Sequence, residues 1–272
     1  MKTKYKILIA KLIFIMISVF RFNLQINCKR NNINWNLDLS EAIDLSVYLF
    51  GKFEHEIADS AFELNLLKNN CIIDIGANIG IQTLQFANKF KNSKIYSIEP
   101  TDYAFKKMQN NIKLNSNLSK RIFPTQAYLT KNKNEMPKNV YSSWKVDSDE
   151  TKHLKHKGIK KSTNNAESIS LDNFILKNKI ENISFIKLDV DGPELNVLKS
   201  GYKILSEKKP PIFMELAPYL YPEFGYKYFD LIKYINFFGY NFYTIKPIKE
   251  IHDIEKFILK ISDGSSRNIL LM

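Results

Sequence analysis

From residue 71 onward, short apolar runs alternate with stretches whose apolar residues recur at the spacing of one helix face. The stretches 81–90 and 103–114 both show this helical spacing, so a helix is expected after each of the first two apolar runs. Strands that alternate with helices are typical of a mostly parallel sheet. The pattern predicts an α/β fold, a seven-stranded, mostly parallel sheet with helices on both faces. The expected strands are 71–75, 94–98, 122–127, 184–189, 211–216, 240–246 and 267–272.

The N-terminal stretch MKTKYKILIAKLIFIMISVFRF combines lysines with an apolar run. A secretory signal peptide would end in a cleavage site of small residues, and none follows Phe20. A spanning helix needs roughly 20 apolar residues, whereas Lys11 interrupts the run 7–20. The remaining interpretations are a helix on the membrane surface, a helix packed on the domain, and an uncleaved anchor. We favour peripheral membrane contact through residues 1–24, within a basic and apolar helical segment over 1–38.

No linker rich in proline, glycine or serine divides the 272 residues, so one main domain is expected over 39–272. Within it, the segment 131–166 is rich in lysine and asparagine and breaks the alternation of strands and helices. Such a segment predicts a variable insertion or a mobile loop. His153 and His156 lie in it among lysines and are expected at the surface.

The strongest chemical signal is CIIDIGANIG, residues 71–80, where the first strand passes into the first helix. Ligands of open α/β sheets bind beyond the carboxyl ends of strands at such crossovers. Gly76 and Gly80 let the backbone approach a ligand, and the amides that open the helix favour an anionic group. A nicotinamide-binding turn would read G-x-G-x-x-G, whereas this chain reads D-x-G-x-N-x-G, with Asp74 on the strand. An acidic residue there suits a cationic ligand and repels a pyrophosphate.

Glu99 ends the second strand, where a carboxylate can accept hydrogen bonds from both hydroxyls of a ribose. Together with Asp74, it predicts a ligand that carries an ammonium, a carboxylate, a sulfonium and a ribose but no phosphate, which is S-adenosylmethionine. For each residue alone, a tight turn or a surface glutamate is the plain alternative. Further cofactor contacts are expected from Asn78 in the turn and Thr83 in the first helix.

The stretch FIKLDVDGPEL, residues 185–195, brings further carboxylates to the same edge of the sheet. A carboxylate that takes the proton of an aligned acceptor hydroxyl contributes roughly 10²–10⁴-fold to a rate. Asp189 is the first choice for this catalytic role and Asp191 the second, while Glu215 on a later strand is a further acceptor contact or is buried against a lysine. Alternatively, Asp191 caps the next helix and Glu194 reaches back to its start. A divalent metal held by Asp189, Asp191 and Glu194 is a further interpretation, which we do not favour.

These motifs together resemble the FkbM-type S-adenosylmethionine-dependent methyltransferases. The resemblance runs from about Leu39 to the C-terminus and includes YLFGKFEHEI, IIDIGANIGIQTLQFA, IYSIEP, ESISLDNFI, ISFIKLDVDGPELNVLKSG and PPIFMEL. It implies the Rossmann-like class I methyltransferase fold and O-methylation of hydroxyls in sugars, polysaccharides or secondary metabolites. The resemblance also suggests that Glu54 contacts the cofactor as part of a lid, although an amphipathic helix with a solvated face explains this residue equally well. Asp191 stands where a glutamate is commoner in that family, and Pro193 where a small residue or histidine is commoner. Both departures fall on the acceptor side of the expected site.

The net charge and the cysteine count limit the kinds of partner and the cellular compartment that are expected. The formal charge of +12 would suit nucleic acid or an anionic membrane, but the lysines are scattered, so no nucleic-acid partner is expected. Cys28 and Cys71 cannot build a disulfide framework, which fits a reducing compartment. We therefore expect a cytoplasmic methyltransferase, at the inner face of the membrane, that acts on a hydroxyl of a sugar, glycan or related metabolite. The alternatives are an RNA methyltransferase and a non-catalytic membrane-surface protein that keeps the cofactor fold.

Overall fold

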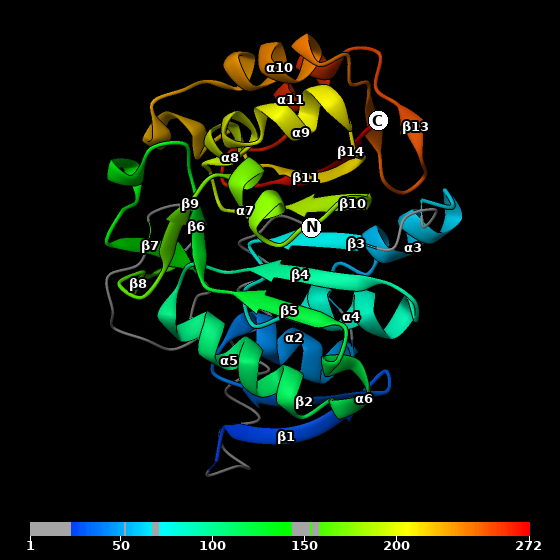
Figure 1. Cartoon of the computed structure of the whole chain (residues 1–272), viewed down its shortest axis with the longest axis vertical. Helices are drawn as coiled ribbons and strands as arrows, with labels where there is room; N and C mark the ends of the chain where they lie inside the picture. The colour runs from blue at the N-terminus through cyan, green and yellow to red at the C-terminus, as the bar shows by residue number, and fades with distance from the viewer. Residues whose placement is uncertain (1–22, 52, 67–70, 143–152, 154–157) are drawn as a thin grey trace.

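The main sheet of the protein has eight strands. The structure is a computed structural model that describes residues 23–51, 53–66, 71–142, 153 and 158–272. The strands are β3 (Cys71–Ile75), β4 (Lys94–Ile98), β5 (Ile122–Thr125), β10 (Ile183–Leu188), β11 (Ile212–Leu216), β12 (Phe242–Thr244), β13 (Lys249–Glu250) and β14 (Arg267–Leu271). Their order is β13-β12-β14-β11-β10-β3-β4-β5 (Figure 1). All seven predicted strands belong to this sheet, which confirms the predicted fold class, and β13 is a two-residue addition at one edge.

The central strands β11, β10, β3, β4 and β5 run parallel, while β14 is antiparallel to both of its neighbours. Every residue of β10 is buried. Parallel strands covered on both faces are typically continuous apolar runs of this kind. Because these strands run parallel, their carboxyl ends meet at one edge of the sheet, and this edge carries the site.

Helices cover both faces of the sheet. One face carries α2 (Ala42–Phe50), α3 (Glu56–Glu63), α4 (Ile81–Lys89), α5 (Asp102–Lys113) and α6 (Ser116–Ser119), and the other carries α7 (Leu171–Lys177), α8 (Glu194–Ser200), α9 (Tyr202–Glu207), α10 (Tyr228–Phe237) and α11 (Ile254–Leu259). Adjacent strand residues point to opposite faces. Ile72 accordingly belongs to the cluster of Leu84 from α4, and Ile73 to the cluster of Phe174 from α7. The helices expected over 81–90 and 103–114 are confirmed as α4 and α5.

The N-terminal part of the described chain is a hairpin rather than a helix. β1 (Gln25–Arg30) pairs antiparallel with β2 (Ile33–Asp38), and β2 buries Ile33, Trp35 and Leu37. Apolar residues that alternate with polar ones in this way favour a strand, so the helical prediction for 1–38 is wrong over these two strands. Residues 1–22, which hold the expected membrane-surface helix, lie outside the described residues. Over the described ranges, no helix combines the length and apolar content needed to cross a bilayer.

The segment 131–166 also contains ordered structure. A short 3-10 turn, η1 (Lys133–Glu135), precedes β7 (Asn139–Ser142), which pairs antiparallel with β8 (Ile159–Ser162). β6 (Ala127–Leu129) and β9 (Glu167–Ile169) pair on either side of this segment. The hydroxyl of Ser162 donates to Asp102 at 2.7 Å, which ties β8 to the start of α5. The prediction of a mobile loop is therefore wrong for the described part of this insertion.

Candidate functional site

A cavity of about 380 Å³ lies at the carboxyl edge of β4, β3, β10 and β11. Its volume falls within the range of roughly 300–1,000 Å³ usual for small-molecule sites. Its walls come from the turns that follow these strands, from β7, and from the short 3-10 helix η2 (Tyr221–Phe224). Among the described residues that line it, Lys187 is the only cation. Its carboxylates are Glu54, Glu99, Asp189, Asp191, Glu215 and Glu223.

The two glycines of the turn after β3 are required by the protein's own packing. Gly76 has φ of +76°, and a Cβ there would lie 1.7 Å from the carbonyl oxygen of Asp189. Gly80 has φ of +87°, and a Cβ there would lie 2.9 Å from Cγ of Met108. Gly76 lines the cavity as predicted, whereas Gly80 instead lets α4 pack on α5.

The amides of this turn serve the protein itself. Gly76 and Ala77 donate their N–H groups to the carbonyl of Ile98 at 2.9 and 3.0 Å, and Asn78 donates to Glu99 Oε2 at 2.9 Å. Each of these three amides therefore already has an acceptor within the protein, and the expectation that the amides opening α4 favour an anionic group stays a prediction. Asn78 itself lines the cavity, as predicted.

Glu99 lies at the end of β4 and lines the cavity although its exposure is only 5%. Its Oε1 accepts hydrogen bonds from the N–H of Thr101 at 3.0 Å and from the Thr101 hydroxyl at 2.6 Å, while Oε2 accepts from Asn78. A carboxylate has about four acceptor positions, so one remains for a ligand hydroxyl. Burial raises the pKa of Glu99.

Asp74 and Thr83, both predicted at the cofactor, lie behind the cavity wall. Both are fully buried, and neither lines the cavity. The Thr83 hydroxyl donates to Asp74 Oδ2 at 2.6 Å and lies 2.8 Å from the hydroxyl of Ser97. Asp74 Oδ1 lies 3.6 Å from Nζ of Lys187. The structure gives them no direct contact with the cavity, so we now expect both to act on it through their neighbours.

The sequence reasoning assigned no role to Lys187. It is 3% exposed on β10, and its ammonium donates to the carbonyl of Gly76 at 3.0 Å and lies 3.3 Å from Asp189 Oδ2. Burial alone would lower the pKa of Lys187, but the charges of Asp189, Asp74 and Glu54 outweigh that effect and raise it. The sequence did contain a sign of this role, because Lys187 is the only charged residue in the buried strand ISFIKL.

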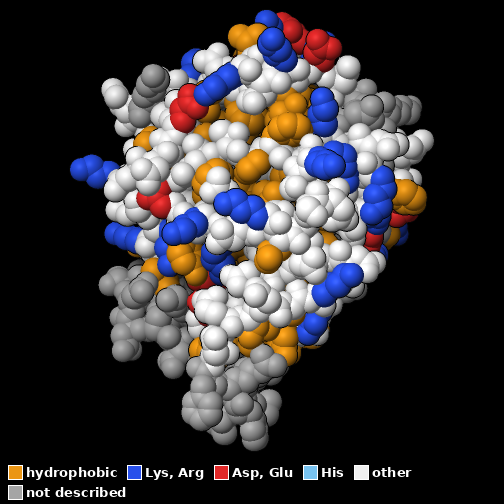
Figure 2. All heavy atoms as spheres, turned by 60° about the horizontal axis from the view of Figure 1, so that its bottom comes forward, with side chains coloured by type: hydrophobic (Ala, Val, Ile, Leu, Met, Phe, Trp, Pro, Cys, Tyr) orange, Lys and Arg blue, Asp and Glu red, His pale blue; other side chains and the backbone are white. Residues whose placement is uncertain are grey.

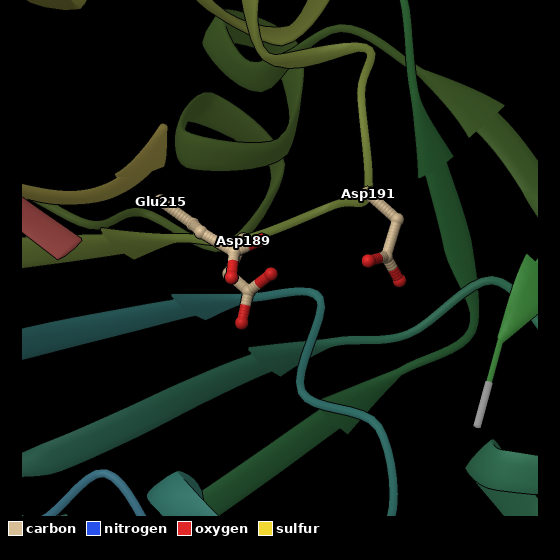
Figure 3. A group of neighbouring side chains, drawn as sticks. All are labelled: Asp189, Asp191 and Glu215. Atoms are coloured by element: carbon tan, nitrogen blue, oxygen red, sulfur yellow. The ribbon is translucent and has the colours of Figure 1, made fainter. Parts of the chain in front are cut away.

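Three acidic side chains, Asp189, Asp191 and Glu215, lie close together beyond the ends of β10 and β11 (Figure 3). Their nearest carboxylate oxygens all lie within 4.8 Å of one another. Glu194 does not line the cavity and is fully buried, and its Oε1 accepts from the N–H of Gly192 at 3.1 Å. The alternative in which Glu194 reaches back to the helix start is thereby confirmed, whereas Asp191 does not act as the cap. We assign no metal to this group.

The crowding of these groups raises their affinity for protons. The surrounding protein, followed by the charges of Asp189 and Glu194, raises the pKa of Asp191 to about 8. Burial and the charge of Asp189 raise the pKa of Glu54 to about 7 and that of Glu215 well above its ordinary value. At neutral pH, part of this negative charge is therefore titratable and responds to a bound cation.

Glu54 lines the cavity as expected for a residue near the cofactor. The side-chain amide of Gln82 on α4 donates to the carbonyls of Phe53 and Glu54, both at 3.0 Å. These bonds fix the loop between α2 and α3 over the start of α4. The segment around Glu54, for which a lid was one interpretation, is therefore part of the cavity wall and is held in place by α4.

The insertion contributes a wall that the sequence reasoning did not foresee. Asn139 and Tyr141 from β7 line the cavity, as does Phe224 of η2. His153 is buried at 7% exposure rather than lying at the surface, and its Nε2 is 2.9 Å from Oε1 of Glu223. The prediction failed because this pairing joins parts of the chain that are distant in sequence. His156 lies outside the described residues.

The chemistry of the cavity fits S-adenosylmethionine. Glu99 keeps one acceptor position for a ribose hydroxyl, and Ile98, Ala127 and Leu129 give the neighbouring wall an apolar surface for a purine. The carboxylates at the other end of the cavity suit the ammonium and sulfonium of that cofactor. Asp74 lies outside the cavity, whereas Glu54 lines it.

The chain is similar to several known proteins. A methyltransferase, sdnD from Sordaria araneosa, is 26% identical over 194 residues, which cover 60% of this chain and 74% of that protein. Among solved structures, TYW2 of M. jannaschii in complex with AdoMet is 16% identical with a TM-score of 0.44, covering 92% of this chain and 85% of its own. A putative O-methyltransferase from Klebsiella pneumoniae is 10% identical with a TM-score of 0.42, covering 80% and 79%. The family description "Methyltransferase FkbM domain" matches residues 74–242, well over half of the chain. The protein therefore belongs to the FkbM family of S-adenosylmethionine-dependent methyltransferases.

Proposed function

We propose that this protein methylates a hydroxyl of a sugar, glycan or related metabolite. The position of Asp189 carries the proposal. Its carboxylate stands at the end of β10, the strand beside β3, and lines the same cavity as Gly76 and Glu99. Neighbouring strands lie ~4.8 Å apart, so Asp189 is one strand away from the cofactor turn. A hydroxyl bound at Asp189 would therefore lie next to the methyl donor.

S-adenosylmethionine would supply a methyl carbon on a sulfonium, and an acceptor oxygen would displace the sulfur from it. Glu99 holds a ribose hydroxyl through its remaining acceptor position. Asp189, with a quarter of its side chain exposed, accepts the proton that the acceptor hydroxyl loses. Asp191 and Glu215 accept hydrogen bonds from other hydroxyls of the acceptor and orient it. Holding the oxygen in line with the methyl carbon is the main contribution of such a site.

The mixture of aromatic and acidic side chains supports a sugar-like acceptor. Tyr141 and Phe224 line the cavity together with Asp191 and Glu215. Apolar faces of a sugar ring pack on aromatic rings, while its hydroxyls donate to carboxylates. An acceptor that carries phosphate would bring negative charge to a wall that already holds several carboxylates.

Binding and transfer assays test the proposal in sequence. Isothermal titration of the full chain should show micromolar binding of S-adenosylmethionine and S-adenosylhomocysteine and none of NAD. Transfer of a tritiated methyl group to neutral sugars and glycans should then exceed transfer to RNA. Binding of NAD alone would remove the methyltransferase assignment, and labelling of RNA alone would replace the acceptor class.

The compartment and the partners belong to the same proposal. We propose a cytosolic location, supported by the cytosolic supply of S-adenosylmethionine, with the N-terminal lysines contacting an anionic membrane face. We propose no nucleic-acid partner, because Lys and Arg side chains are dispersed over the face in Figure 2 rather than gathered. Liposome flotation of the full chain, compared with a variant carrying Lys4→Glu, Lys6→Glu and Lys11→Glu, tests the membrane contact. Equal flotation of both proteins would contradict it.

A further inference from the structure

Lys187 is a buried cation near the carboxyl end of β10, a strand whose residues are all buried. Lysines are almost never fully buried unless their charge is paired, because an unpaired ammonium loses its hydration without compensation. Here the side chain reaches the carboxyl edge of the sheet, and 3% of its surface is exposed. Its partners therefore decide what it does there.

The ammonium of Lys187 contacts both halves of the site. On the cofactor side it donates to the carbonyl of Gly76 at 3.0 Å and approaches that of Ile75 at 3.4 Å. On the acceptor side it lies 3.3 Å from Asp189 Oδ2. One charged group thus touches the cofactor turn and the carboxylate at which the acceptor is expected.

Asp74 supplies a buried counter-charge from behind. It faces Lys187 across the parallel pair β10 and β3, where the two residues are register partners. Its own position is fixed by the Thr83 hydroxyl at 2.6 Å, and Thr83 in turn lies 2.8 Å from Ser97 on β4. Since Asp74 does not line the cavity, its charge acts there through Lys187.

We propose that Lys187 is a positioning residue, which holds the cofactor turn at Gly76 and the acceptor-side carboxylate of Asp189 in one frame, with Asp74 as its buried counter-charge. The inference rests on the proposed function, because it places Lys187 between the sites of cofactor and acceptor. A structural ion pair alone would need Asp74 only. The additional contacts with Gly76 and Asp189 connect the pair to the site.

The same ammonium limits the negative charge that the cavity must tolerate. Burial raises the pKa of Glu54 before α3 and of Glu99 after β4, and in both cases the charge of Lys187 opposes that rise. The charge of Lys187 also acts to lower the pKa of Asp191 after β10. Glu215 of β11 completes the acidic groups around this end. Removing Lys187 should therefore shift the ionisation of these groups to higher pH as well as loosen the turn.

The informative variant removes the buried pair together. Lys187→Met alone leaves Asp74 without a counter-charge and is expected to unfold at a lower temperature. Asp74→Asn/Lys187→Met restores charge balance, and Lys203→Met on exposed α9 is the matched control. We expect the double variant to unfold near the wild-type temperature yet bind S-adenosylmethionine about tenfold more weakly. The pH at which its affinity is half-maximal should rise by ~1 unit, since an opposite charge at 4–6 Å shifts a pKa by about 1–3 units.

A folded double variant with wild-type affinity and an unchanged pH midpoint would overturn the inference and leave Lys187 a structural ion pair. A measurement on the wild-type protein decides the matter should that variant not fold. Addition of S-adenosylhomocysteine should shift both the Nζ resonance of Lys187 and the carboxyl resonance of Asp189 in NMR spectra, and movement of neither would overturn the inference. If the wild type binds neither compound, the proposed function fails. The carboxyl titrations of Glu54 and Asp191 in wild type and double variant then test Lys187 separately, and identical titrations overturn its role.

Discussion

At the cofactor end of the cavity, Glu99 accepts three hydrogen bonds from its neighbours, whereas at the acceptor end Asp189, Asp191 and Glu215 crowd within 4.8 Å of one another. The first arrangement leaves one acceptor position with a fixed direction. The second leaves negative charge for which, among the described lining residues, Lys187 is the only cation. The hydrogen-bonding geometry of the cofactor end is therefore fixed before a ligand binds, while the ionisation of the acceptor end depends on which ligand binds there.

This contrast assigns different properties to the two ends. Preorganised acceptors and donors cost no rearrangement when a ligand binds, so the cofactor end should favour one ligand geometry. Crowded carboxylates respond to charge and to hydroxyl donors more than to shape. Variation of the acceptor among related proteins would then require changes at only one end of the cavity. The following variants test this difference between the two ends of the cavity.

Asp189→Asn should have the largest effect, and only at the acceptor end. Loss of a carboxylate that takes the hydroxyl proton should lower turnover by roughly 10²–10⁴-fold. Asparagine keeps the size of the side chain, so S-adenosylhomocysteine should bind within about threefold of wild type. Initial rates with tritiated cofactor and calorimetry measure the two effects. Glu207→Gln, on the exposed end of α9, is the matched control, and normal turnover of Asp189→Asn would make Asp189 structural.

Gly76→Ala should disturb the backbone contact between the turn after β3 and Asp189, which joins the two ends of the cavity. A Cβ at this position would lie 1.7 Å from the carbonyl oxygen of Asp189, in a residue with φ of +76°. Collision and left-handed backbone together should lower the free energy of unfolding by about 2–4 kcal/mol. Gly225→Ala isolates the backbone contribution, because Gly225 has φ of +75° and a Cβ there would meet none of the described residues within 4 Å. Equal losses in urea denaturation of both variants would remove the collision argument.

Seven of the eight strands of the sheet could be predicted from sequence because each is a local, mainly apolar run, whereas β13 consists of two exposed charged residues. The turn after β3 and the carboxylates Glu99 and Asp189 were located correctly for the same reason: strand ends are local features, and parallel strands bring those ends to one edge. The hairpin β1–β2 was also readable, since Ile33, Trp35 and Leu37 alternate with polar residues. It was missed because the helical pattern of the first residues was extended across it.

The features of the site that were not predicted depend on how strands distant in sequence pair with one another. Lys187 faces Asp74 only because β10 pairs with β3 in a particular register, across more than a hundred residues of sequence. The same pairing turns Asp74 away from the cavity, so its expected contact with the cofactor could not be excluded from sequence. The contact of His153 with Glu223 likewise joins residues that are distant in sequence. Charged residues inside apolar strands are the local sign that such a partner exists.

Glu99→Ala should affect the cofactor end alone. It removes the acceptor for a ribose hydroxyl and for the amides of Asn78 and Thr101, so cofactor binding should weaken by roughly 1–3 kcal/mol. Calorimetry with S-adenosylhomocysteine measures the loss. Glu223→Gln, which changes a carboxylate on the acceptor rim, should leave this affinity unchanged. If both variants weaken binding equally, the cavity has no division into two ends.

The smallest effect should be a pH dependence of the ratio between two affinities. The two ligands are S-adenosylmethionine, which carries a positively charged sulfur, and S-adenosylhomocysteine, whose sulfur is neutral. Because the pKa of Glu54 is raised to about 7 and that of Asp191 to about 8, both lose protons as pH rises from 6 to 9. Ionised carboxylates attract a sulfonium, so affinity for S-adenosylmethionine relative to S-adenosylhomocysteine should increase with pH, by about 1 kcal/mol for one solvated ion pair. Glu99 contacts both compounds alike and should cancel in this ratio. Asp191→Asn should reduce the rise, and calorimetry that finds a ratio constant or falling with pH would show that these carboxylates lie away from the transferred methyl group.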